Sequence, residues 1–124
     1  PQELGNLFRL NELSMYSNLL GGAIPARLSN CSRLLGLSVD SNRLGEGIPS
    51  ELGSLTQLTG LYLGSNNLKG KLPASFGNLT SLELLDFSSN NLEGGIPDDI
   101  ARLAQMVNFD ARGNHFSGVF PPAI

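Results

Sequence analysis

Few side chains in this 124-residue sequence are of the types that carry out covalent or metal chemistry. The chain has one cysteine, Cys31, and one histidine, His115. A nucleophile or a general base needs partner groups held beside it, and no motif in the sequence supplies them. Zinc-ligand spacings, a G-x-x-x-x-G-K phosphate loop and a G-x-S-x-G nucleophile motif are missing as well. The sequence therefore predicts no catalytic residue, no bound metal and no cofactor.

Three aspartates, Asp40, Asp86 and Asp110, raise the question of a calcium site. Calcium takes roughly six to eight oxygen ligands at close range. The three aspartates are far apart in the sequence, and no other acidic residue adjoins any of them. Three carboxylates so widely spread do not supply that shell. We therefore interpret them as groups for hydrogen bonds and ion pairs with a ligand.

The composition excludes several classes of protein. The length allows one domain, and 40% hydrophobic with 15% charged residues exclude a disordered polyelectrolyte. A net charge of -3 excludes the basic surface of a nucleic-acid-binding protein. No apolar run approaches the roughly 18 residues that cross a bilayer. Because the sequence begins without a signal segment, we expect a mature, truncated or non-secreted chain.

Prolines and asparagines recur along the chain with a 24-residue period. Six of the seven prolines fall in one frame: Pro1, Pro25, Pro49, Pro73, Pro97 and Pro121. Asparagines hold the same spacing: Asn18, Asn42, Asn66, Asn90 and Asn114. Apolar columns complete a unit that reads L-x-x-L-x-L-x-x-N-x-L-x-G-x-I-P, then x-x-L-x-x-L. Self-similarity at a fixed period of this length is typical of a solenoid.

Each part of the unit has a structural meaning. The alternating L-x-L segment predicts a strand with one buried face, and one strand per unit predicts a parallel sheet with about 4.8 Å between turns. The asparagine side chain both donates and accepts, so we expect it to bind backbone groups where each strand turns a corner. Proline fixes φ and keeps the return path extended or turn-like. Glu46 breaks a column of glycines, and we expect a local adjustment of the loop there.

The stretch from Leu58 to Pro73, LTGLYLGSNNLKGKLP, carries the whole motif, and four counterparts repeat it. The sequence resembles the leucine-rich repeat of the plant extracellular type, and is most like the ectodomains of plant receptor-like kinases. The resemblance implies a right-handed superhelix of five 24-residue units, with a parallel β-sheet on the concave face and loops and 3-10 turns on the convex side. Residues 1–124 would form one array, an uncapped segment of a longer ectodomain, because the family's paired-cysteine caps are missing.

The concave face of such a solenoid is where the repeat varies while its geometry stays fixed. Residues between the strand leucines face this side, and both tyrosines of the chain are among them. Tyrosine offers a large contact area at little entropy cost and anchors many interfaces. The ligand-binding residues that we predict share this face: Tyr16, Asp40, Tyr62, Asp86, Asp110 and Arg112.

Charge on the predicted concave face is acidic. Glu12, Asp40, Asp86, Asp110 and Arg112 sum to -3, the net charge of the whole chain. Asp86 and Asp110 fall in one column on adjacent turns, so their carboxylates should repel each other by roughly 0.8 kcal/mol in water. Arg112 can relieve this repulsion diagonally. We therefore expect the face to favour a cationic or mixed peptide, of which five strands hold only a short stretch.

Two N-glycosylation sequons, Asn30-Cys31-Ser32 and Asn78-Leu79-Thr80, lie two repeat units apart. They occupy the same place in alternate turns, away from the concave face. We predict Asn30 and Asn78 as glycosylation sites. Asn30 is the weaker acceptor, because Cys31 fills a leucine column as a small buried hydrophobe.

The resemblance implies extracellular recognition of a peptide or protein ligand, in signalling or innate immunity, with a kinase elsewhere in the full-length protein. It also implies a leucine-rich-repeat co-receptor and a place on the extracellular side of the plasma membrane. This segment itself would contact neither nucleic acid nor membrane. Two alternatives stay open: a secreted inhibitor of a microbial wall-degrading enzyme, and a structural fragment that binds no ligand.

Overall fold

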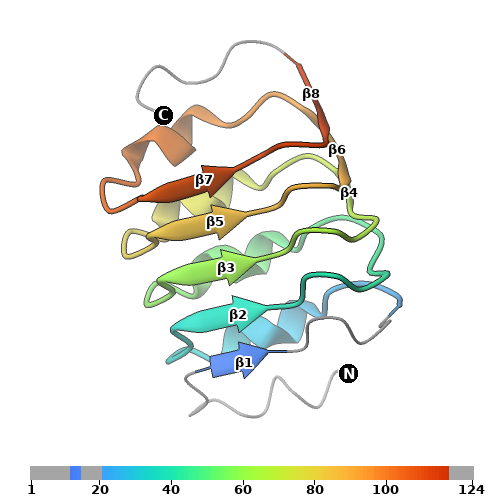
Figure 1. Ribbon diagram of the computed structural model, residues 1–124. Helices are drawn as coiled ribbons and strands as arrows, with labels where there is room; N and C mark the ends of the chain where they lie inside the picture. The colour runs from blue at the N-terminus through green and yellow to red at the C-terminus, as the bar shows by residue number, and fades with distance from the viewer. Residues whose placement is uncertain (1–11, 15–20, 118–124) are drawn as a thin grey trace.

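The structure, a computed structural model, describes residues 12–14 and 21–117. Five short parallel strands stack on one side of the molecule in the order β1-β2-β3-β5-β7 (Figure 1). They are β1 Glu12–Ser14, β2 Gly36–Ser38, β3 Gly60–Tyr62, β5 Leu84–Asp86 and β7 Asn108–Asp110. Every strand residue pairs with its counterpart in the next repeat, as Leu37 does with Leu61. The predicted solenoid, in which every turn adds one strand to this parallel sheet, is confirmed.

Short 3-10 helices return the chain on the side opposite this sheet (Figure 1). They are η2 Ala26–Asn30, η3 Ser50–Ser54, η4 Ala74–Asn78 and η5 Asp98–Arg102. Each follows a proline whose φ lies between -59° and -66°, the value that its ring imposes. The proline has no N–H, but its carbonyl closes the first turn: Pro25 O accepts the N–H of Leu28 at 3.1 Å. The recurring proline thus sets where each helix begins.

A second parallel sheet, with order β4-β6-β8, lies beside the main sheet (Figure 1). Its strands are β4 Lys69–Gly70, β6 Asn91–Gly94 and β8 His115–Phe116. Gly22, Gly70 and Gly94 have φ of 79°, 83° and 78°, a conformation that glycine adopts without a steric cost.

Glu46 occupies the same column as these glycines and has φ of 59°. The sequence predicts a local adjustment of the loop at this position. The structure shows instead that the backbone keeps the left-handed conformation of the glycine column. A residue with a Cβ is strained there, because the Cβ approaches the following carbonyl oxygen. Gly118, the last glycine of the column, lies outside the described residues.

The apolar columns meet between the sheet and the 3-10 helices. Leu37, Leu61 and Leu85 of the strands have no exposed surface, nor have Leu52 and Phe76 of the helices. Because every turn has the same frame, each side chain is covered by its counterparts in the turns on either side. The core is therefore continuous along the coil and belongs to no single turn.

Burial falls in the last described turn. Met106, Phe109 and Phe116 are only partly buried although they occupy core columns, and Val107 is 76% exposed. The Phe87 ring of the preceding turn meets the rings of Phe109 and Phe116 edge to face, with centroids 5.3 and 5.6 Å apart. Such aromatic pairs stabilise beyond the area that they bury, so they join this turn to the rest of the core.

Buried asparagines fix the corner where each turn leaves the sheet. The Asn66 side-chain amide donates to the carbonyls of Leu63 and Gly64 in its own turn, at 3.2 and 3.1 Å. It also reaches Val39 O of the preceding turn at 3.1 Å, while its Oδ1 accepts the N–H of Leu44 at 3.0 Å. The same four contacts recur at the next two asparagines of the column. The predicted role of these residues is confirmed.

Candidate functional site

Alternation within each strand sends its middle residue into the core and its neighbours to the concave face. In β3, Leu61 has no exposed surface, whereas Tyr62 is 36% exposed. Tyr62 pairs in register with Asp86 of β5, and Asp86 pairs with Asp110 of β7. The structure thus places three predicted ligand-binding residues in one row across three adjacent strands.

These side chains line an open hollow of about 570 Å³ over β3, β5 and β7. Four of the six predicted ligand-binding residues line it: Tyr62, Asp86, Asp110 and Arg112. Leu84 and Phe109 add apolar surface to the same hollow. Concave surfaces with a few polar groups among apolar ones are where small ligands and side chains commonly bind.

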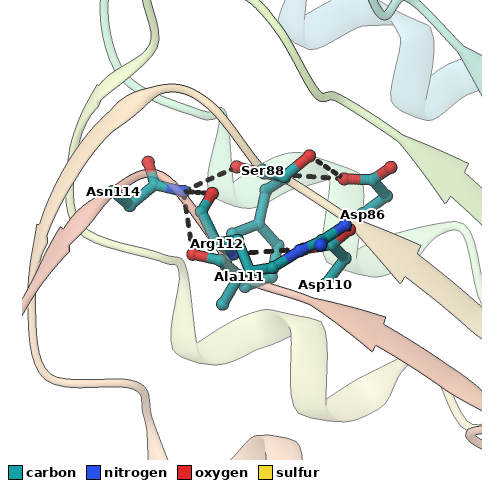
Figure 2. A network of polar contacts seen from close by, with 7 residues as sticks. Asp86, Ser88, Asp110, Ala111, Arg112 and Asn114 are labelled. Carbon is teal, nitrogen blue, oxygen red and sulfur yellow. Dashed lines mark hydrogen bonds and ion pairs between the residues drawn. The ribbon is translucent and has the colours of Figure 1, made fainter.

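Asp110 and Arg112 form a paired unit on one wall of the hollow (Figure 2). The Arg112 Nε donates to Asp110 Oδ1 at 3.0 Å, and its Nη2 donates to Oδ2 at 2.9 Å. The Arg112 backbone N–H also donates to Oδ1 at 3.1 Å. These hydrogen bonds, the side-chain ones first, hold the pKa of Asp110 below its ordinary value of 3.8. Both carboxylate oxygens of Asp110 are therefore engaged.

The sequence predicts a diagonal contact between Arg112 and Asp86, and the structure replaces it with this contact within one turn. Asp110 raises the pKa of Arg112 through its hydrogen bonds and its charge, and the charge of Asp86 adds a smaller effect in the same direction. Arg112 therefore balances the acidic row mainly at Asp110.

Asp86 is held by its own turn and keeps one oxygen open. Its Oδ1 accepts the N–H of Ser88 at 2.9 Å and the Ser88 hydroxyl at 2.7 Å (Figure 2). Within the described residues, Oδ2 of Asp86 has no hydrogen-bond or salt-bridge partner. Gly64 makes room for this arrangement, since a Cβ there would stand 3.1 Å from both Asp86 Oδ1 and Ser88 Oγ. The carboxylate is therefore oriented before any ligand arrives.

The ring of Tyr62 lies back along its own strand. A Cβ added to Gly60 would stand 3.1 Å from Cε2 of the ring and 3.5 Å from its hydroxyl oxygen. Gly60 is buried although it lies on the concave face. Its missing side chain thus leaves the space that the Tyr62 ring fills, and the ring forms one apolar wall of the hollow.

Asp40, another of the predicted ligand-binding residues, does not line the hollow. It follows β2, is half-buried and accepts a hydrogen bond from the Ser38 hydroxyl. Tyr16 lies outside the described residues. The structure therefore brings four of the six predicted residues together.

The sequence places Leu84, Ser88 and Asn108 in columns of the concave face, but they were not among the predicted ligand-binding residues. Leu84 and Asn108 line the hollow, and Ser88 orients Asp86. The spacing D-x-S over Asp86–Ser88 is a signal that could have found the last of these, because residues i and i+2 of a strand share one face. The spacing D-x-R over Asp110–Arg112 is the same signal one turn later.

The remaining candidate residues lie elsewhere. Asn30 and Asn78 are the exposed last residues of η2 and η4, on the side opposite the main sheet. Cys31 is buried, which raises the pKa of its thiol. His115 is exposed on β8. In the part of the chain that the structure describes, no three His, Cys, Asp or Glu residues gather in a group that could hold a metal ion.

Comparison with known proteins establishes the class. The family described as leucine rich repeat matches residues 56–116. The chain is a leucine-rich-repeat protein of the plant extracellular type, most like the ectodomain of a leucine-rich-repeat receptor kinase. No curated protein matches the sequence significantly.

Solved structures of plant receptors share the fold along nearly the whole chain. The peptide hormone receptor RGFR1, solved with RGF2, is 36% identical, with a TM-score of 0.97 over 100% of this chain and 20% of that one. The ectodomain of the Arabidopsis receptor kinase HAESA, solved with an extended IDA peptide hormone, is 39% identical, with a TM-score of 0.95 over 99% and 21%. A chain of the BIR3–SERK2 complex from Arabidopsis thaliana is 34% identical, with a TM-score of 0.90 over 94% and 62%.

The chain thus spans about a fifth of the RGFR1 and HAESA structures that it matches. Among the described residues, no helix is both long and apolar enough to cross a membrane.

Proposed function

We propose that this chain is a ligand-recognition segment of a plant receptor kinase ectodomain and binds a peptide or protein ligand on its concave face. The hollow over β3, β5 and β7 carries the proposal, because it gathers Tyr62, Asp86, Asp110 and Arg112 on neighbouring turns. Its groups are oriented by contacts within the protein, so little order needs to be created on binding. Tyr16 and Asp40 belong to the same predicted surface.

The solved neighbours support a peptide ligand. RGFR1 and HAESA were each solved with a peptide hormone on a solenoid that this chain matches at 36% and 39% identity. The complex of BIR3 with SERK2 supports a further leucine-rich-repeat partner. We therefore propose that residues 1–124 form one array within a longer extracellular domain, with a co-receptor as second partner and the kinase elsewhere in the protein.

Glycosylation at Asn30 and Asn78 is compatible with this role. Both residues are exposed on the side opposite the sheet, so a glycan there leaves the hollow accessible. The sequon hydroxyl residues Ser32 and Thr80 are exposed as well. Buried Cys31 and buried Leu79 follow the two asparagines directly, so burial of the middle residue does not distinguish the two sites.

The proposed function is tested by binding of a displayed library of secreted plant peptides to the purified chain. Tyr62→Ala combined with Asp86→Ala removes two walls of the hollow and should weaken the binding of selected peptides by at least about tenfold. Circular dichroism and the thermal midpoint should stay close to those of the wild type, because both side chains lie at the surface.

Gln57→Ala combined with Gln105→Ala is the matched control. Both glutamines are exposed and lie outside the hollow, so this variant should bind selected peptides as the wild type does. Unchanged affinity in a well-folded Tyr62/Asp86 variant would contradict the proposed site.

A further inference from the structure

We infer that the hollow receives a lysine side chain of the ligand, with the ammonium group on Asp86 and the methylene stem against Tyr62 and Leu84. The inference rests on the proposed function and deepens it, because it names the side chain that the hollow selects. Charge, hydrogen-bonding capacity and apolar lining each support it separately.

The charge of the hollow points to a cation. On the described part of the concave face, the carboxylates of Glu12, Asp40, Asp86 and Asp110 stand against the single cation Arg112. Arg112 engages both oxygens of Asp110 at 2.9 to 3.0 Å. Within the hollow, Asp86 is therefore the carboxylate without a salt bridge among the described residues. A ligand group of positive charge complements it.

The hydrogen bonds of Asp86 favour lysine over arginine. Each carboxylate oxygen offers about two acceptor sites. Oδ1 already accepts the backbone N–H and the hydroxyl of Ser88, which leaves Oδ2 for the ligand. A guanidinium group gains its advantage by binding both oxygens at once as a fork, whereas an ammonium group binds one oxygen as a point charge. One open oxygen therefore suits the ammonium group.

The apolar lining suits the stem of the same side chain. Leu84 and Asp86 stand two residues apart on β5 and so share the concave face. Leu84 pairs in register with Gly60, and the Tyr62 ring covers Gly60. The ring and the leucine therefore flank the approach to Asp86. Lysine buries its methylene groups along apolar surface while its ammonium group stays polar.

The experiment selects short peptides from a random displayed library against the immobilised chain. Selected peptides should share a lysine at one aligned position. Synthetic peptides in which this lysine is replaced by norleucine, which keeps the stem and loses the charge, should bind about tenfold more weakly. Replacement by arginine should weaken binding by about threefold or more.

Three variants separate the effect of the Asp86 charge, the effect of arginine binding two carboxylate oxygens and the effect of apolar contacts with the lysine stem. Asp86→Asn keeps an acceptor for Ser88 but loses the charge, so lysine and norleucine peptides should bind it equally. Ser88→Ala frees one site on Oδ1, so the preference for lysine over arginine should shrink. Gly60→Ala brings a Cβ to 3.1 Å from the Tyr62 ring, so the ring must shift by a few tenths of an ångström, and lysine and norleucine peptides should weaken alike. Glu51→Gln, an equal charge change on η3 outside the hollow, is the control and should change nothing.

Each outcome bears on a different claim. Selected peptides that lose affinity in the Tyr62/Asp86 double variant but share no lysine overturn the lysine inference and leave the proposed function standing. Arginine peptides that bind as well as lysine peptides also overturn it. Failure to select any peptide that depends on Tyr62 and Asp86 overturns the proposed site and this inference with it.

Discussion

Leu61 and Tyr62 are neighbours on β3, yet they belong to two different regions of the molecule. Leu61 lies in the core between Leu37 and Leu85, its register partners, and leucine fills that column in all three turns. Tyr62 lies on the concave face between Ser38 and Asp86, so its column changes from a hydroxyl to a phenol to a carboxylate over three turns. The same backbone therefore carries a constant side that holds the coil together and a variable side that is free for recognition.

The difference shows where stability resides. Each side chain on the constant side is covered by the turns on either side, so removing one weakens the packing of three turns. On the variable side, contacts such as that between Asp110 and Arg112 are closed within one turn and are exposed to solvent. Substitutions should therefore separate cleanly into those that unfold the coil and those that change only its surface.

The largest loss of stability is expected for Leu61→Ala. The side chain is fully buried, and removing it costs its transfer free energy and leaves a cavity, about 3 to 5 kcal/mol in all. Tyr62→Ala, one residue away, should cost about 1 kcal/mol or less, because its side chain lies at the surface. Urea unfolding followed by circular dichroism measures both losses of stability. Similar losses for the two variants would contradict the claim that stability resides on the constant side.

Asn66→Ala should come next, with a loss of about 2 to 3 kcal/mol. The substitution removes an acceptor from Leu44 N–H and a donor from three carbonyls in a buried corner. Asn114→Ala should cost less, because Asn114 is only half-buried and water can replace its contacts. Hydrogen exchange checks the mechanism: the Leu44 amide should exchange faster in Asn66→Ala and be unaffected in Asn114→Ala.

A gain of about 1 kcal/mol is expected for Glu46→Gly, because a residue with a Cβ is strained in the left-handed region. Glu46 has φ of 59°, and the strain relieved exceeds the extra chain entropy that glycine loses on folding. The reciprocal change Gly70→Ala, at φ of 83°, should destabilise by a similar amount. Thermal midpoints that move in these opposite directions would show that the backbone is strained at Glu46 in the wild type. A lower midpoint for Glu46→Gly would contradict this strain.

The smallest effect concerns the Asp110–Arg112 pair on the variable side. The Arg112 hydrogen bonds lower the pKa of Asp110 below 3.8, so their stabilisation is present above that pH and is lost as the pH falls through the lowered pKa. In Arg112→Gln, the carboxyl pKa should rise toward its ordinary value of 3.8, as measured by NMR titration. Arg102→Gln, which breaks the Asp99 pair on η5, should leave the titration of Asp110 unchanged.

The constant side could be predicted from the sequence because many positions repeat one physical requirement. Every turn must bury a leucine at positions such as 37, 61 and 85, so the register follows from the period alone. The variable side obeys no shared requirement. Its columns could be assigned from the sequence. Side-chain geometry, which no periodicity encodes, decides that the Tyr62 ring lies over Gly60 and that Arg112 pairs with Asp110. At Glu46 the repeat overrides the local preference, because the neighbouring turns impose a left-handed backbone conformation that a residue with a Cβ disfavours.

The register of one strand per repeat also governs how a peptide can run across the coil. Strands follow one another at about 4.8 Å, while an extended peptide offers side chains to one face about every 6.8 Å. When one peptide side chain lies over a strand, the next ones therefore lie between strands, and the two spacings match again only after about seven turns. Five strands are too few for a second coincidence. For the proposed peptide ligand, we therefore expect one side chain to be seated fully and its neighbours to meet the surface between turns.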